Sequence, residues 1–274
     1  MTNIGVWGTA VAVAGEVSRV PTDPQPATRR SRAAHLRELI IEVTLIASML
    51  FFYQGVRHLA DGQLSLAFQH ADLVWQIERI LHLPNEATVQ GWALTWPDTA
   101  RLANLYYVGV HFPGTLLAMV WLWIWHRSDY LRMRTEMAVL TAAALALHVI
   151  FPLAPPRLMH EFGMVDTMLT TGPSAYPDSS TDGVANQFAA MPSLHVGWAL
   201  LVAVALIRVS ASRWRWLALL HPALTLSVVV VTANHYWLDG IVAAVLLFCS
   251  VRLVASWSHR PLEHPLPVFS RIML

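Results

Sequence analysis

Two histidines, an aspartate and an arginine lie beside apolar segments in the second half of the chain. His235 and Asp239 are four residues apart, so they share one face if their segment is helical. His195 and Arg157 each follow a proline-containing turn next to another apolar segment. Ionisable groups at membrane depth are costly and therefore usually serve a function. Together these four residues indicate phosphoryl chemistry on a lipid.

The His235–Asp239 pair suits nucleophilic catalysis. A carboxylate that accepts a hydrogen bond from one imidazole nitrogen fixes the tautomer and leaves the other nitrogen free to attack phosphorus. The alternative is a purely structural pair, because buried polar groups need partners in any case. An aspartate inside an apolar segment, near a second histidine, favours the catalytic interpretation.

His195 is the expected general acid, because cleavage of a phosphate ester requires a proton for the leaving alkoxide. Pro192 suits a first helical turn, where free backbone N–H groups bind anions, and Ser193 adds a hydroxyl donor. Arg157 follows Pro155–Pro156, and its guanidinium can hold two phosphate oxygens. The alternatives are a helix cap with an incidental histidine and an interfacial arginine anchor.

The composition predicts an integral membrane protein. Hydrophobic residues make up 55% of the chain and charged residues only 13%, against roughly 25% charged in soluble domains. We predict an all-α, polytopic domain over residues 37–256, with an additional interfacial helix in 72–96 that could equally be an ordinary solvent-side helix. The six expected transmembrane helices are 38–58, 102–126, 134–154, 192–210, 215–234 and 236–256.

Both termini are expected to be cytoplasmic tails, a disordered one over 1–36 and a shorter one over 257–274. Of 18 arginines, 14 fall in the tails or in the connections on the same side of the membrane, and there is no lysine. The positive-inside rule therefore places the termini in the cytoplasm of a multi-pass cell-membrane protein, with the four polar residues on the extracytoplasmic face. Nothing in this pattern indicates nucleic-acid binding.

Other polar residues are expected near the same face. Tyr107, His111 and His148 could line a pocket, although both histidines could equally be packing residues between helices. None of the histidines has the paired spacing of a zinc motif, so neither a metal nor another cofactor is expected. The acidic loop 158–190 could form a lid, and Cys249, the single cysteine, is expected to be a packing residue.

The three motifs resemble the membrane branch of the type-2 phosphatidic acid phosphatase (PAP2) superfamily over roughly residues 70–256. The counterparts here are Pro156–Arg157, Pro192–Ser193–Leu194–His195, and His235 with Asp239. The resemblance implies that His235 is the nucleophile, that Asp239 orients it and that His195 is the acid. These roles agree with those expected from the residues themselves.

The departures from the family pattern are informative. No lysine precedes Arg157, Leu194 replaces a glycine, and Val228–Val229 stand where a Ser-Arg pair is expected. The chain is similar to inositol phosphorylceramide synthase and sphingomyelin synthase, and the former shares the Pro-Ser-Leu-His motif. With two usual cations missing, the residues expected to hold the phosphate are Arg157, Ser193 and Asn234, with Pro156 nearby.

We therefore expect a membrane lipid as substrate, cleaved through a phosphohistidine, with a lipid alcohol or water as the acceptor. A headgroup transferase is favoured over a phosphatase for lipid or polyprenyl phosphates. A non-enzymatic membrane protein that kept the fold is a third interpretation. Vanadate-dependent oxidation is disfavoured because its site needs several cations around the oxyanion. The sequence predicts no oligomeric state.

Overall fold

The computed structural model describes residues 63–174 and 188–258, together with a few residues between 36 and 55. The chain divides into two units, Met1–Ile46 and Ala47–Leu274, and all the elements named below belong to the second. In the described part of that unit the regular elements are all helices, and one isolated parallel bridge joins Leu153 to Ala189. The all-α prediction is confirmed there. The expected tails and most of the first expected span lie outside the described residues.

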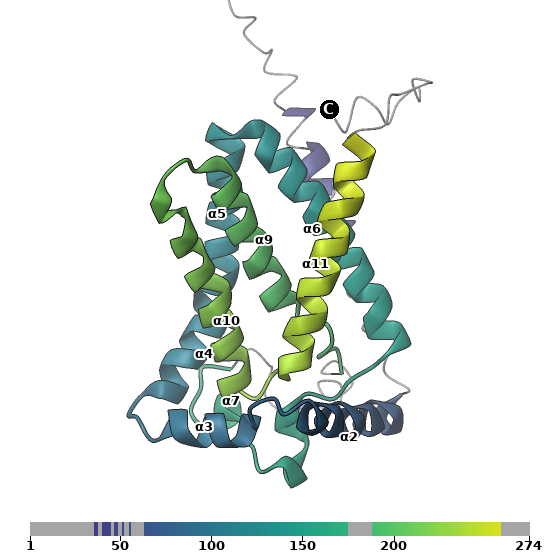
Figure 1. The fold of residues 1–274 in the computed structure, drawn as a ribbon, viewed down its shortest axis with the longest axis vertical. Coiled ribbons are helices and arrows are strands. Elements are labelled where there is room, and N and C mark those ends of the chain that lie inside the picture. Colours follow the sequence, from purple (N-terminus) through teal and green to yellow (C-terminus); the bar gives the residue numbers. More distant parts are fainter. Residues whose placement is uncertain are drawn as a thin grey trace, which may run out of the picture. The chain divides into compact units, whose positions relative to one another are not determined.

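Four helical stretches are long and apolar enough to cross a membrane. They run side by side through the body of the bundle, with a shorter apolar helix among them (Figure 1). The first consists of α4 and α5, and the third of η3 and α10. The elements are α4 (Thr99–Gly109), α5 (His111–Trp125), α6 (Arg127–Ile150), α9 (Leu194–Val209), η3 (Arg213–Leu219), α10 (Leu220–Val231) and α11 (Trp237–Ser258).

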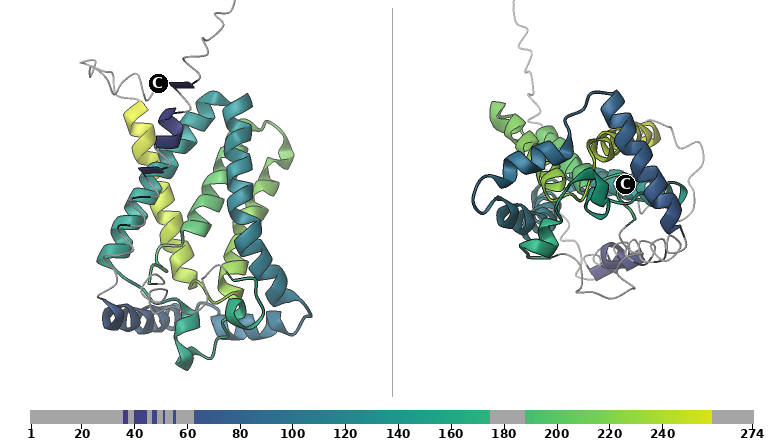
Figure 2. Two further views of the ribbon diagram at one scale, coloured as in Figure 1. Left: turned by 180° about the vertical axis from the view of Figure 1, so that it is seen from behind. Right: turned by 90° about the horizontal axis from the view of Figure 1, so that it is seen from below.

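Two further helices lie across one end of this bundle, α2 (Leu64–Ile80) and α3 (Glu86–Leu94) (Figures 1 and 2). The buried residues of α2 are Ala67, Ala71, Val74 and Glu78, whose spacing of three to four residues defines one helix face. The small side chains on this face allow close packing. Exposed residues of α2 include the large apolar side chains of Leu66, Leu73, Ile77 and Ile80.

The centre of the bundle is packed closely around α9. A cluster of buried side chains from α5, α6, α9 and α11 includes Leu122, Met133, Leu140, Leu201 and Leu247. Gly197 of α9 lets α6 approach, because a Cβ there would stand 3.3 Å from a Leu140 methyl carbon. The helix α9 contacts α5, α6, α10 and α11, so it lies at the centre of the bundle.

The structure corrects the expected boundary between the second and third spans. The expected spans 102–126 and 134–154 leave 127–133, with Arg127 and Arg132, as a connection, but α6 already begins at Arg127 and only His126 separates it from α5. The charges are tolerated because they find partners. Fully buried Glu136 pairs with Arg132 at 3.0 Å and with Arg208 at 2.7 Å.

Candidate active site

Three connections meet at the end of the bundle nearest α2. They are the segment after α6, the segment before α9 and the segment before α11. The Leu153 amide donates to the Phe188 carbonyl at 2.9 Å, which joins the first two. The Arg157 amide donates to the Ala233 carbonyl at 2.9 Å, which joins the first and third. The three sequence motifs, far apart along the chain, are therefore hydrogen-bonded to one another.

The orientation of His235 is fixed by two acceptors on one ring nitrogen. Nδ1 lies 2.8 Å from the Ala190 carbonyl oxygen and 3.1 Å from Oδ2 of Asp239. A carbonyl oxygen can only accept, so Nδ1 carries the proton and donates. Nε2 is therefore the nitrogen with the free lone pair. The same Asp239 oxygen also accepts from the Tyr236 amide at 2.9 Å, which holds the carboxylate in place.

The last helix, α11, begins at Trp237, one residue after the start of the expected span 236–256, so His235 lies just before the helix. The contact between the two side chains nevertheless forms, because the connection turns the ring toward the first helical turn. Ala233, with a φ of 56°, has a left-handed backbone conformation within this turn.

His195 occupies the first turn of α9 and faces the His235 ring, with 5.9 Å between ring centroids. Tyr107 stacks on His195 at 4.3 Å, and Phe112 meets its edge at 5.2 Å. His195 Nε2 is buried and has no hydrogen-bond partner within 63–174 and 188–258. A buried polar atom of this kind calls for a partner that a bound substrate would provide.

Ser193 is the N-cap of α9. Its Oγ accepts from the Val196 amide at 3.4 Å, and its own amide donates to the Asp239 carbonyl at 3.1 Å. Ser193 is fully buried. Through these two hydrogen bonds it caps α9 and joins α9 to α11. Its hydroxyl hydrogen is still able to donate to an anion.

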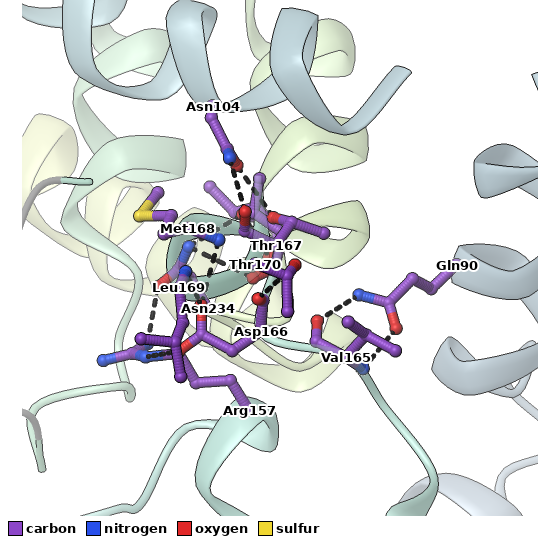
Figure 3. A network of polar contacts seen from close by, with 12 residues as sticks. Gln90, Asn104, Arg157, Val165, Asp166, Thr167, Met168, Leu169, Thr170 and Asn234 are labelled. Atoms are coloured by element: carbon purple, nitrogen blue, oxygen red, sulfur yellow. Dashed lines mark hydrogen bonds and ion pairs between the residues drawn. The ribbon is translucent and has the colours of Figure 1, made fainter. Parts of the chain in front are cut away.

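Arg157 and Asn234, expected to hold phosphate, are in direct contact. Nη1 of Arg157 donates to Oδ1 of Asn234, whose Nδ2 donates to Oγ1 of Thr232 at 2.8 Å. Nε of Arg157 also lies 3.6 Å from a carboxylate oxygen of Asp166 (Figure 3). Arg157 is only 6% exposed, so its guanidinium is held within the protein and faces an acidic neighbour.

Asp166 belongs to the part of the expected lid that the structure describes. The segment contains η1 (Pro156–Leu158), η2 (His160–Phe162) and α7 (Thr167–Thr170), whose N-cap is Asp166. Gln90 of α3 and Asn104 of α4 hydrogen-bond to Val165 and Thr167 (Figure 3). The described half of this loop is thus fastened to the bundle. Residues 175–187 lie outside the description.

The remaining expected pocket residues have different surroundings. His111 is fully buried, with its ring centroid 4.9 Å from that of His195. His148 donates from Nε2 to the Pro192 carbonyl at 3.2 Å, which gives it a structural partner. Pro156 is buried at the start of η1. Of this group, Tyr107 and His111 lie in ring contact with His195.

Sequence reasoning missed three groups near the site. The Ala190 carbonyl could not be found from the sequence, since every residue has a backbone carbonyl. Asp166 was noted only as part of an acidic loop. Glu78 accepts a hydrogen bond at 2.7 Å from the Leu238 amide in the first turn of α11. The sequence could have indicated Glu78, because it lies at helical spacing from Ala71 and Val74 on an otherwise apolar helix face.

The family model of the PAP2 superfamily matches residues 72–253, which include all three motifs. The chain belongs to this superfamily, whose members are generally phosphatases or phosphotransferases. This membership and the four apolar helices indicate a membrane protein with a phosphatase-type activity on lipid phosphate esters. No curated protein and no solved structure matches the chain.

Proposed function

We propose that the protein transfers a phospho-headgroup from one membrane lipid to an alcohol acceptor through a phosphohistidine at His235. The observation that carries the proposal is the pair of acceptors on Nδ1, the Ala190 carbonyl and the Asp239 carboxylate, because they leave Nε2 unprotonated. A neutral imidazole with a defined free nitrogen is a competent nucleophile toward phosphorus. Asp239 then stabilises the positive charge that develops on the ring.

The reaction has two balanced steps. Nε2 attacks phosphorus, the bond from phosphorus to the lipid oxygen breaks, and His195 gives that oxygen its proton. The acceptor hydroxyl next loses its proton to His195, its oxygen attacks phosphorus, and the P–N bond breaks. His195 thus acts first as acid and then as base. The ring centroids of His195 and His235 are 5.9 Å apart, so both side chains are close enough to act on one phosphoryl group.

An alcohol acceptor is favoured over water by the surroundings of His195. Tyr107, His111 and Phe112 pack their rings against it, and its Nε2 is buried. These aromatic surroundings suit the hydroxyl group of a lipid, whose apolar chain can pack against the rings. The Pro-Ser-Leu-His motif, similar to that of inositol phosphorylceramide synthase, points the same way. The second candidate, a lipid or polyprenyl phosphate phosphatase, is favoured by membership of the PAP2 superfamily itself.

The proposed membrane arrangement has six spans, with the site on the extracytoplasmic face and both termini in the cytoplasm. The distribution of arginines supports this orientation. The helix α2 is proposed to lie in the interface on the side of the site. Its exposed Leu66, Leu73, Ile77 and Ile80 would rest in the lipid headgroup region.

The proposal is tested by a product assay on the purified full-length protein in mixed micelles. A panel of phospholipids is supplied with and without ceramide or diacylglycerol. A new phospholipid that appears only with the acceptor supports the transferase. Inorganic phosphate released from a phosphomonoester regardless of acceptor supports the phosphatase instead. An inert wild-type protein across the panel contradicts both and supports a non-enzymatic role.

Arg157 provides a second test, since we propose that it holds the phosphate with Asn234 and Ser193. Arg157→Lys keeps the charge but loses the forked donor geometry that binds two oxygens. We expect kcat/KM to fall roughly 10- to 150-fold, which corresponds to about 1.5–3 kcal/mol for a hydrogen bond to a charged group. Steady-state kinetics with the best substrate of the panel measure the loss.

The matched control for this prediction is Arg101→Lys, because Arg101 is exposed on α4. The thermal unfolding of both variants should be compared, since the Arg157 side chain also contacts Asn234 and Asp166. An Arg157→Lys protein with the kcat/KM of the wild type would mean that the phosphate is held elsewhere.

A further inference from the structure

The start of α11 is capped by a side chain from another helix. Glu78 of α2 is fully buried, and its Oε1 accepts from the Leu238 amide at 2.7 Å. Leu238 is the second residue of α11, so its amide is among the four that a helix start leaves without an intrahelical acceptor. The Trp237 indole adds a second link, since it donates to the Pro84 carbonyl in the turn after α2 at 2.8 Å.

This cap adjoins the group that orients the proposed nucleophile. Asp239 follows Leu238 directly and accepts from both His235 Nδ1 and the Tyr236 amide. A shift of the first turn of α11 would therefore move the carboxylate relative to the imidazole. The Tyr236 hydroxyl, which donates to the Ala154 carbonyl at 3.0 Å, ties the same turn to the segment after α6.

Two buried carboxyl groups, Glu78 and Glu86, lie beside a single cation, Arg79, so one of the two is expected to be protonated. Glu86 of α3 is also fully buried, and Arg79 lies 3.0 Å from Glu86 but 3.7 Å from Glu78. Burial raises the pKa of Glu78 to about 9, and its hydrogen bond with Glu86 and the negative charges of Glu86 and Asp239 act in the same direction, against the hydrogen bond from the Leu238 amide, which lowers the pKa. At neutral pH Glu78 is thus the neutral acid, and Arg79 pairs with Glu86.

We propose that Glu78 is a positioning residue for the reaction: its Oε1 holds the Leu238 amide and thereby sets Asp239 against His235. The inference rests on the proposed phosphoryl transfer at His235. Ionised Glu78 would place another negative charge in the buried region around Asp239 and disturb the balance with Arg79. The titratable and charged groups grouped around Glu78 and Tyr236 are Asp72, Arg79, Glu86 and Asp239.

The substitutions Glu78→Gln and Glu78→Ala distinguish a positioning role of the Glu78 hydrogen bonds from the effect of any change at this position. In Glu78→Gln the amide oxygen still accepts from Leu238 and the NH₂ group still donates to Glu86. We expect its kcat at pH 7 to stay within about twofold of wild type. Glu78→Ala removes both bonds, and we expect kcat to fall about 100-fold, with KM within about twofold, as for a misplacement of about 1 Å.

The dependence of kcat on pH provides a second test, because replacing a glutamate with a purely structural role would not change it. The wild-type kcat should fall as the pH rises through about 9, because the raised pKa keeps Glu78 neutral only below that value. In Glu78→Gln there is no proton to lose, so this alkaline limb should shift to higher pH. An unchanged limb in Glu78→Gln, or an activity as low as that of Glu78→Ala, would overturn the proposal.

The matched controls are Glu161→Gln and Glu161→Ala, because Glu161 is an exposed carboxylate in η2. Both should keep the wild-type kcat and alkaline limb. Two further measurements do not depend on turnover. The infrared carbonyl band of a protonated carboxyl group should be present in wild type at pH 7 and absent in Glu78→Gln. The Nδ1–H proton resonance of His235 should persist in Glu78→Gln and shift in Glu78→Ala.

These readouts distinguish the two possible failures. An inert wild-type protein that still shows the infrared band and the response of His235 contradicts the proposed function alone, leaving the positioning of His235 by Glu78 intact. A wild-type kcat or His235 resonance in Glu78→Ala contradicts the positioning role. If Glu78→Ala does not fold, the pH profile and infrared band of Glu78→Gln decide the question.

Discussion

Replacing His235 with alanine is expected to abolish formation of the phosphoenzyme and to lower kcat by on the order of a thousandfold or more. The reason is that Nε2 of His235 is the nitrogen left free by the two acceptors on Nδ1. The measurement uses a substrate labelled with ³²P at the phosphate. Rapid quenching should trap label on wild-type protein in an acid-labile, alkali-stable form, as expected of a phosphohistidine, and no label on His235→Ala.

The control for this experiment is His160→Ala, because His160 is an exposed histidine of η2 near the same end of the bundle. It should label and turn over as the wild type does. Asp239→Asn should label slowly, because the neutral amide no longer stabilises the positive charge that develops on His235. Label on His235→Ala at the wild-type level would remove the phosphohistidine from the mechanism.

Loss of His195 is expected to have the second largest effect, and its size should depend on the leaving group. A general acid contributes about 10²- to 10⁴-fold, so His195→Ala should lose that much kcat with a lipid substrate. An aryl phosphate such as p-nitrophenyl phosphate needs little protonation of its leaving oxygen. Its labelling rate should therefore fall much less. Rates of both substrates are compared in wild type and variant.

The proposed role of His195 as the base in the second step can be tested in His195→Ala as well. With the aryl substrate, the phosphoenzyme of His195→Ala should accumulate, because no base activates the acceptor hydroxyl. Tyr107→Phe is the matched comparison, since it keeps the ring stacked on His195 and should preserve the dependence on leaving group. Equal losses with lipid and aryl substrates in His195→Ala would argue against an acid role and for a packing role.

The surroundings of the proposed nucleophile show where sequence reasoning ends. The spacing of His235 and Asp239 predicts their contact, since four residues bring two side chains together in a helical turn. It does not predict that the Ala190 carbonyl accepts from the same ring nitrogen. A backbone carbonyl that is 45 residues away leaves no trace in residue type.

Charged residues inside the bundle illustrate the same limit. An arginine in an apolar stretch suggests a loop when its partners are unknown, so Arg127 and Arg132 fall in the expected connection between the spans 102–126 and 134–154. The structure places them in α6, where Glu136 is shared between Arg132 and Arg208. The pairing with Arg208 spans 72 residues, and only the packing of α6 against α9 brings it about.

The all-helical membrane character, the described apolar helices and the residue types of the three motifs could all be predicted from the amino-acid sequence. These follow from hydropathy and from short spacings, which act over a few residues of chain. The tertiary structure alone decided which nitrogen of His235 is free, that Asp166 faces Arg157, and that Glu78 caps α11. Such contacts join residues distant along the chain, and their geometry depends on how whole helices pack together.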